Sequence, residues 1–226
     1  MAAALVIGAA GGIGTAIADA LEAGPIIDRI TRLSRRDGDI DLTDEASVEE
    51  AARRLSDDGA AFDLIFDATG VLEAAGSGPE KSFKDLSPDA MMDAFAVNAI
   101  GPALIFKHFG PLLAQDNKAV IATLSARVGS IGDNRLGGWM SYRASKAALN
   151  QLVRCAAIEL KRTRKHSIVV ALHPGTIETP LTRAYARGKY TASPQEAAHQ
   201  MLSVLQKLTP EDSGKFFDYA GKEIPW

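Results

Sequence analysis

The chain opens with a short apolar run, residues 3–7, that leads directly into the glycine-rich turn Gly8-Ala9-Ala10-Gly11-Gly12-Ile13-Gly14. Residues 15–23 then carry apolar side chains at helical spacing. A glycine-rich turn between a buried first strand and a helix lets the pyrophosphate of a dinucleotide approach the backbone at the helix N-terminus. A plain tight turn is the alternative interpretation. We expect the following residues of the turn to contact such a cofactor: Gly8, Gly12, Ile13 and Gly14.

Apolar strand-like runs alternate with helical patterns along the whole chain. We expect further strands at residues 29–34, 62–66, 118–124, 168–172 and 216–219, and helices at 43–55, from 87 onward, at 147–160 and at 194–208. The expected N-caps of three of these helices are Thr43, Ser87 and Ser193. Strands that alternate with helices form a parallel sheet covered on both faces. The sequence therefore predicts an α/β fold, a doubly wound parallel sheet in three α/β/α layers, formed by one domain over residues 1–226.

Composition and charge narrow the classes of protein. A net charge of −3 with 23% charged residues gives no sign of a nucleic-acid partner or a membrane surface. The apolar N-terminal run is too short to span a membrane, so we expect a cytoplasmic protein. The single cysteine, Cys155, excludes an internal disulfide and a cysteine-rich metal site, and we predict no bound metal. Its apolar helical surroundings predict a buried structural thiol.

The end of the second expected strand indicates which dinucleotide is bound. Sites that prefer NAD place an acidic residue here to bind the ribose 2′-hydroxyl. This chain has Ser34, Arg35 and Arg36 instead, which suit an anionic 2′-phosphate. We therefore predict NADP(H), with NAD(H) not excluded. The small residues Ala68, Thr69 and Gly70, at the end of another expected strand, fit a cofactor that crosses the same edge of the sheet.

Tyr142 and Lys146 are four residues apart, so they share one face of a helix. A phenol has a pKa of about 10, too high for proton exchange at neutral pH, and a neighbouring ammonium is expected to lower it. An incidental surface pair is the alternative interpretation. Asn98 lies in the middle of another expected helix, where asparagine is unfavourable. This position indicates either a functional amide or a buried amide that is simply hydrogen-bonded.

Together these motifs resemble the short-chain dehydrogenase/reductase family of classical type. The resemblance rests on the glycine turn, Asp41-Leu42, Asp67-Ala68-Thr69-Gly70, Asn98, Ser125, Tyr142 with Lys146, and Pro174-Gly175, in the family's order. The segments 128–150, 172–176 and 221–226 are similar to the short bacterial C-factor-like members. The resemblance implies a Rossmann fold and hydride transfer between a nicotinamide and a carbonyl or alcohol.

The resemblance also implies roles for individual residues. Tyr142 is the expected general acid or base, and Ser125 is expected to hydrogen-bond the substrate oxygen. Lys146 is expected to bind the nicotinamide ribose and lower the pKa of the tyrosine, while Asn98 holds a water of a proton relay. The remaining expected cofactor contacts are Asp41, Leu42, Pro174, Gly175, Thr176 and Thr179, of which Thr179 fits the carboxamide position better than Thr176.

The sequence departs from the family's pattern at three places. Asp67-Ala68-Thr69-Gly70 stands where Asn-Asn-Ala-Gly is usual, Ile7 replaces a common threonine, and Gly11 occupies a position that is often basic in NADP-preferring members. These departures affect the fine geometry of the cofactor site and leave the expected reaction class unchanged.

The sequence predicts only the class of substrate and the kind of assembly. The segment after Pro180, which covers the substrate in this family, is short and basic; Arg183, Arg187 and Lys189 could attract an anion or simply face solvent. Trp139 could line an apolar pocket, the core or a subunit contact. We expect a small-molecule carbonyl or alcohol substrate and a homodimer or homotetramer. The alternative function is a cofactor-binding signalling or redox-sensing protein with little or no turnover.

Overall fold

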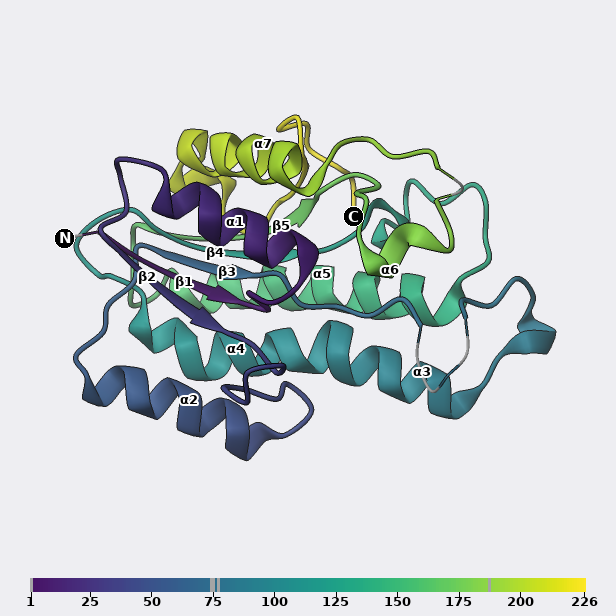
Figure 1. Cartoon of the computed structure of the whole chain (residues 1–226), viewed down its shortest axis with the longest axis horizontal. Coiled ribbons are helices and arrows are strands. Elements are labelled where there is room, and N and C mark those ends of the chain that lie inside the picture. Colours follow the sequence, from purple (N-terminus) through teal and green to yellow (C-terminus); the bar gives the residue numbers. More distant parts are fainter. Residues whose placement is uncertain (1, 74–75, 77, 187) are drawn as a thin grey trace.

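Six parallel strands form one sheet through the centre of the molecule (Figure 1). The computed structural model describes residues 2–73, 76, 78–186 and 188–226. The strands are β1 (Ala3–Ile7), β2 (Arg29–Leu33), β3 (Leu64–Asp67), β4 (Ala119–Leu124), β5 (Ser167–His173) and β6 (Phe216–Asp218). Their order is β2-β1-β3-β4-β5-β6, which confirms the predicted doubly wound parallel sheet. All carboxyl ends of the strands therefore meet at one edge of the sheet, where ligands bind in folds of this kind.

Helices cover both faces of the sheet (Figure 1). One face carries α1 (Gly12–Glu22) and α7 (Pro194–Lys207), and the other carries α2 (Glu45–Asp57), α4 (Gly101–Phe109) and α5 (Met140–Leu160). α3 (Pro88–Phe95) continues into α4 through a π-helical turn, Ala96–Ile100, and the short α6 (Pro180–Arg183) follows β5. These layers are the predicted α/β/α arrangement.

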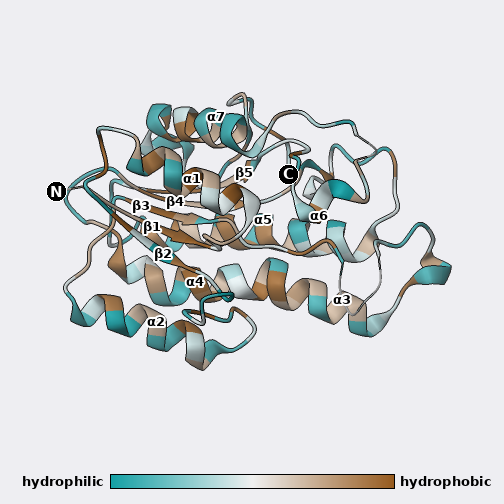
Figure 2. Ribbon diagram, in the orientation of Figure 1, coloured by the Kyte–Doolittle hydropathy of each residue, from teal (hydrophilic) through white to brown (hydrophobic). Residues whose placement is uncertain are grey.

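The side chains of the central strands alternate between two apolar layers. Leu5 and Ile121 belong to the layer under α2, α4 and α5, whereas Val6 and Ala122 belong to the layer under α1 and α7. Figure 2 shows the resulting contrast, with apolar strands inside and polar outer helix faces. Burying an aliphatic side chain of this size stabilises the folded state by about 1.5–3 kcal/mol. The two apolar layers therefore hold the strand ends in fixed positions relative to one another.

Two of the three expected helix caps are confirmed and one is wrong. The Ser87 hydroxyl accepts from Ala90 N at the start of α3, and Ser193 forms a capping box with Glu196 at the start of α7. α2 is capped by Asp44, whose side chain accepts from Ala46 N. The expected cap, Thr43, instead donates its hydroxyl to the Asp41 carboxylate at 2.7 Å. Because the Thr43 hydroxyl is bonded to this carboxylate, it does not cap α2.

Two further expectations about α5 are corrected. The helix begins at Met140, seven residues before the expected start at Ala147, so it includes Tyr142 and Lys146 in its first turns. Cys155 is exposed, where we expected a buried thiol. It lies four residues from exposed Gln151, on the outer side of the helix, because the inner side is occupied by residues such as Val153.

The helical run Pro88–Leu112 is long and apolar enough to cross a membrane by length and composition alone. In the fold, α3 packs on α5 and α4 packs on α2. Its apolar residues Ile105 and Phe109 are fully buried in the protein core. The core helix of a soluble protein satisfies the same test, and the packing contacts bury 39% of the apolar window.

The close packing of the glycine turn after β1 leads to a prediction about stability. A Cβ at Gly14 would lie 2.2 Å from the carbonyl oxygen of Gly8, closer than any real side chain approaches backbone. We expect Gly14→Ala to displace the turn and to lower the free energy of unfolding by about 1–3 kcal/mol, as overpacking usually does. Urea denaturation measures this change. Gly11→Ala is the matched control, since a Cβ there would lie 3.3 Å from Gly8 O, and equal effects of the two substitutions would contradict the account.

Candidate active site

A continuous cleft runs along the carboxyl edge of the sheet. One part is bordered by the glycine turn, Ser34 and Asp41, and an adjoining part of about 560 Å³ is bordered by Ser125, Tyr142 and the segment after β5. The two parts share residues of the glycine turn, both arginines that follow β2 and the end of β3. The predicted residues that border the cleft are Gly8, Gly12, Ile13, Ser34, Arg35, Arg36, Asp41, Leu42, Ala68, Thr69, Gly70, Ser125, Tyr142, Lys146, Pro174, Gly175 and Thr179.

Three predicted site residues are not in the lining of the cleft. Gly14 lies behind the turn and is buried against Gly8. Thr176 donates its backbone N–H to the Thr191 hydroxyl at 3.1 Å, outside the lining. Asn98 is fully buried beneath the cleft. Of the two threonines considered for the carboxamide position, only Thr179 is therefore placed at the cleft.

α5 presents three polar side chains on the face that packs against the sheet. Tyr142, Lys146 and Asn150 follow each other at intervals of four residues, so they form one row. The Lys146 ammonium donates to the carbonyl oxygen of Leu124 at 2.8 Å, and the Ser125 hydroxyl donates to Asn150 Oδ1 at 2.7 Å. The end of β4 and the start of α5 are thus bonded to each other directly at the site.

Burial controls the protonation of Tyr142 and Lys146. It raises the pKa of the Tyr142 phenol to about 12 and lowers the pKa of the Lys146 ammonium to about 8, while the Asp67 carboxylate acts in the opposite direction on Lys146. We expected the ammonium to lower the pKa of Tyr142. That expectation is wrong for this structure, because burial of the phenol itself raises its pKa. Tyr142 is therefore held as a neutral phenol.

Asn98 lies at the centre of the π-helical turn and fixes the chain beyond β3. Its Oδ1 accepts from Val71 N at 2.9 Å, and its Nδ2 donates to Val71 O at 2.9 Å and to the Ser145 hydroxyl at 3.2 Å. π-Helical turns of this kind are frequent at functional sites. Gly70 packs against the same amide: a Cβ there would lie 3.3 Å from both Asn98 Oδ1 and Lys146 Nζ. The water of the expected proton relay stays a prediction.

Asp67 is buried at the end of β3, where the family usually has an amide. Its Oδ2 accepts from the Thr123 hydroxyl at 2.6 Å, and its Oδ1 accepts from Thr69 N at 2.9 Å and from the Thr69 hydroxyl at 2.5 Å. Burial raises the pKa of this carboxyl above its ordinary value, against these bonds and the nearby Lys146 charge. The aspartate thus fixes Thr69 in the cleft wall.

Sequence reasoning missed Asn150, although one signal could have found it. Asn150 lies four residues beyond Lys146 and so continues the row of Tyr142 and Lys146. It is 3% exposed, and its Nδ2 donates to Gly129 O at 3.3 Å. Its contact with Ser125 joins residues 25 positions apart, which no local pattern indicates.

Glu80 is a second missed residue, from a segment expected to be a surface loop. It is only 7% exposed; its carboxylate accepts from Ser141 N at 3.2 Å and from the Ser141 hydroxyl, and its backbone oxygen accepts from Trp139 N. Trp139 precedes α5 in the left-handed conformation, with φ of 53°, and caps nothing with its side chain. Glu80 therefore supplies the cap that begins the helix of Tyr142.

His173 is a third missed residue and borders the cleft at the end of β5. Burial and the Arg127 charge lower the pKa of its imidazole to about 4, so the ring is neutral. Its buried Nδ1 has no hydrogen-bond partner within the described part of the chain. The position before Pro174-Gly175 gave no chemical signal by itself.

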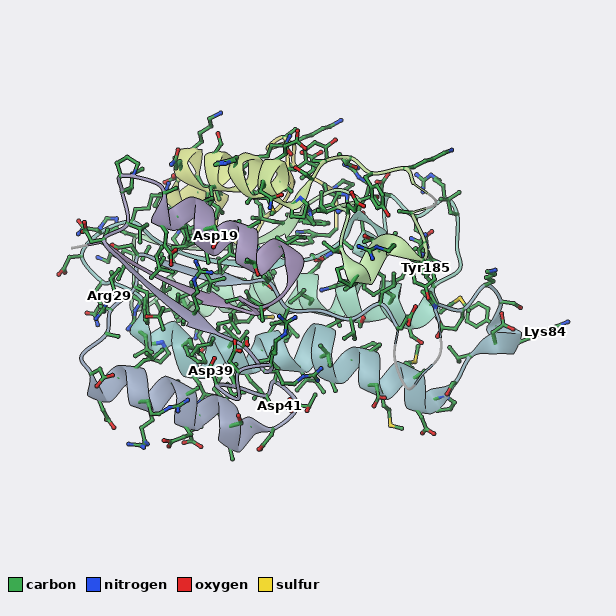
Figure 3. All side chains as sticks on the ribbon, viewed as in Figure 1. Asp19, Arg29, Asp39, Asp41, Lys84 and Tyr185 are labelled. Carbon is green, nitrogen blue, oxygen red and sulfur yellow. The ribbon has the colours of Figure 1, made fainter. Side chains whose placement is uncertain are left out.

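Aromatic side chains and the segment after β5 border the far side of Tyr142. The Trp139 ring meets those of Tyr142 and Tyr185 edge to face, with centroids 6.3 and 5.7 Å apart. Tyr185, labelled in Figure 3, follows α6 and donates to Glu73 Oε1 at 2.5 Å. Of the basic residues in this segment, Arg183 and Lys189 are exposed, and Arg187 lies outside the described residues.

The cleft, sheet and glycine turn define a dinucleotide-binding α/β protein. A family model described as Enoyl-(Acyl carrier protein) reductase matches residues 8–217. The 1-hydroxy-2-glutathionyl-2-methyl-3-butene dehydrogenase of Rhodococcus sp. (strain AD45) is 35% identical over 189 residues, which cover 83% of this chain and 78% of that protein. The C-signal protein of Myxococcus xanthus is 35% identical over 164 residues, which cover 73% of this chain and 92% of that one.

A solved structure agrees with this assignment. The NADPH-bound carbonyl reductase from chicken fatty liver is 26% identical, with a TM-score of 0.85 and coverage of 99% of this chain and 94% of that one. The chain belongs to the short-chain dehydrogenase/reductase family of oxidoreductases. The resemblance noted from the sequence motifs is confirmed.

The Glu80 cap leads to a stability prediction. Loss of a helix cap lowers the free energy of unfolding by about 1–2 kcal/mol. In a chain of this size, we expect Glu80→Ala therefore to lower the melting temperature by about 3–6 °C. Differential scanning calorimetry measures the change. Glu80→Gln keeps an acceptor oxygen and should lose less, and Lys84→Ala, at the exposed end of the same segment (Figure 3), should lose nothing. A Glu80→Ala protein as stable as Lys84→Ala would refute the capping role.

Proposed function

We propose that the protein is an NADP(H)-dependent oxidoreductase that transfers hydride between the nicotinamide and a carbonyl or alcohol substrate. One observation carries the proposal: Ser125, Tyr142 and Lys146 border the same cleft as the glycine turn and the arginines that follow β2. A general acid, a polar partner for the substrate oxygen and a dinucleotide site thus share one cavity. Membership of an oxidoreductase family supports the same reaction class.

The residues of the cleft fit a dinucleotide. A Cβ at Gly12 would lie 2.9 Å from Thr179 Cγ2, so a larger residue there would fill the space over the start of α1. The N-terminus of α1 has no side-chain cap of its own and offers backbone N–H groups to a pyrophosphate. Arg32 is engaged with Asp19 and Glu22, whereas Arg35 and Arg36 border the cleft. These two arginines and the NADPH of the chicken enzyme support NADP(H) here.

Three side chains of the protein have separate roles in the proposed reaction. Tyr142, held as a phenol by burial, donates its proton to the substrate oxygen during reduction. Lys146, fixed on Leu124 O, holds its ammonium beneath the cleft, where it can bind a ribose hydroxyl. Ser125 lies at the end of β4 as the polar partner of the substrate oxygen. When bound, the nicotinamide supplies or accepts the hydride.

Removing the phenolic oxygen tests the mechanism. We expect Tyr142→Phe to lower kcat at least 100-fold, as loss of general acid catalysis does, while the Kd for NADPH changes less than about twofold. NADPH absorbance is followed with a panel of aldehydes, ketones and quinones. Tyr219→Phe, the same substitution in the turn after β6, is the control and should be as active as the unmodified chain. Unchanged turnover in Tyr142→Phe would rule out the mechanism.

Removing the basic side chains tests the cofactor. We expect Arg35→Ala to raise the Kd for NADPH about 10- to 100-fold, the value of a charge-assisted bond to phosphate, and to change the Kd for NADH much less. Fluorescence titration measures both constants. Arg29→Ala, at the far end of β2 (Figure 3), is the control. Equal loss of affinity for both cofactors would contradict a 2′-phosphate site.

The similarity to C-signal favours a second candidate function, a signalling or redox-sensing protein whose cofactor occupancy changes a partner surface. The Tyr142→Phe variant separates the two candidates. A variant that binds NADPH and keeps full biological activity would support sensing, and one that loses both turnover and biological activity would support catalysis.

We also propose that the chain forms a homodimer or homotetramer through the helical run that contains Asn98 and through α5, which contains Tyr142. Ile100, at the end of the π-helical turn, is 54% exposed, and Ile158 on α5 is 50% exposed. A contact between copies of the chain at these helices would bury both side chains. Sedimentation equilibrium decides this point, and a single-protomer mass would contradict it.

A further inference from the structure

After β6 the chain turns back, and residues 224–226, which we call the returning segment, lie against the turn 127–133 beyond β4. The reversal is fixed by an antiparallel bridge between Glu223 and Phe217 of β6. The side chain of Ile224 is 2% exposed and belongs to the apolar layer under α2, α4 and α5. The returning segment, near the end marked C in Figure 1, is therefore anchored in the core.

The other two residues of the returning segment hold one side of this turn. The main-chain oxygen of Trp226 accepts from Gly132 N at 2.9 Å, and Pro225 O accepts from the Ser130 hydroxyl at 2.5 Å. Ser130 is 1% exposed, so water cannot readily replace its bond. The Trp226 ring stacks on Phe216 of β6, with centroids 5.9 Å apart and 14° between the planes. The ring thus fixes the residue whose oxygen binds Gly132.

The opposite side of the turn packs against the polar row of α5. A Cβ at Gly129 would lie 2.8 Å from Lys146 Cβ and 2.9 Å from the Lys146 carbonyl carbon, so the two backbones are in close contact. Gly129 O also accepts from Asn150 Nδ2 at 3.3 Å, and Asn150 Oδ1 is bonded to the Ser125 hydroxyl at 2.7 Å. A displacement of the turn would therefore move Ser125 and Lys146 in the cleft.

We propose that the returning segment is a positioning element of the active site and that Trp226 is its positioning residue. The inference rests on the proposed oxidoreductase function and adds to it residues that lie outside the lining of the cleft. The turn is held between the returning segment on one side and Lys146 on the other. Its position sets where Ser125 and Lys146 lie relative to Tyr142. Because a misplacement of about 1 Å can slow a positioned reaction ~100-fold, the segment acts on the rate of turnover.

The test removes the anchor and measures rate and cofactor affinity separately, well below the melting temperature of each variant. We expect Trp226→Ala to lower kcat about tenfold, while the Kd for NADPH changes less than about twofold, because the glycine turn and the arginines after β2 do not contact the returning segment. Trp226→Phe keeps a ring on Phe216 and should restore most of the rate. NADPH absorbance with the panel of carbonyl compounds gives kcat, and fluorescence titration gives the Kd.

Glu223→Ala is the matched control. Glu223 precedes the returning segment, and its exposed carboxylate lies 4.0 Å from Lys215 Nζ, away from the turn. Its kcat should equal that of the unmodified chain. A purely structural role predicts that Trp226→Ala lowers the melting temperature and keeps its kcat, and that result would overturn the proposal. A Trp226→Phe variant as slow as Trp226→Ala would overturn it as well.

The second link to the turn gives an independent variant. Ser130→Ala removes the bond to Pro225 O and should also lower kcat. Because Trp226 and Ser130 act through the same turn, the double variant Trp226→Ala/Ser130→Ala should be about as slow as the slower single variant. Losses that multiply in the double variant would show that the two residues act separately and would contradict the proposal.

A third measurement needs no substrate. Hydrogen–deuterium exchange, followed by mass spectrometry, compares Trp226→Ala with Glu223→Ala, and we expect faster exchange in the turn 127–133 with unchanged exchange in the glycine turn. Faster exchange confined to residues 216–226 would overturn the proposal. If no compound of the panel is reduced, the proposed function fails, and the effect on rate fails with it. The exchange of the turn would then still show whether the returning segment holds it.

Discussion

The bond between the Lys146 ammonium and the carbonyl of Leu124 is the contact on which the site depends. It joins α5 to the end of β4 inside the protein, where an unpaired charge would be very costly. Lys146 is 3% exposed, and Asp67, also buried, lies near enough to favour its charged form. Because Tyr142, Lys146 and Asn150 share one row of α5, fixing Lys146 also fixes the two residues on either side of it.

Burial then sets the chemistry of the row. The pKa of Tyr142 rises to about 12 and that of Lys146 falls to about 8, both because a low-dielectric surrounding penalises charge. A neutral phenol is a proton donor, and Ser125 at the end of β4 is bonded to the buried Asn150 behind it. The protonation of the site is thus determined by burial, and the cleft surface alone does not reveal it.

Local patterns predicted the fold and much of the site. The glycine turn after β1, the arginines after β2 and the Tyr142–Lys146 spacing are short-range signals, and each is placed at the cleft as expected. Glu80 could not be predicted, because it meets Ser141 across 61 residues of sequence. The bond between Ser125 and Asn150 could not be predicted for the same reason, because the two residues are 25 positions apart.

Two of the expectations that were wrong depended on burial. Cys155 lies in an apolar helical pattern, yet α5 turns that position to solvent. The expected lowering of the tyrosine pKa considered only the neighbouring ammonium and not the desolvation of the phenol itself. Burial is a property of the whole fold. A motif of two residues therefore cannot show how far burial shifts a pKa, or in which direction.

The central claim is that hydride passes between a nicotinamide bound at the glycine turn and a substrate carbon beside Tyr142. The most direct measurement uses NADPH carrying deuterium at the transferable C4 position, with a ketone of the panel, and mass spectrometry of the alcohol formed. The account predicts that the alcohol carries one deuterium on the former carbonyl carbon. An alcohol without deuterium, formed while the cofactor keeps its label, would contradict it.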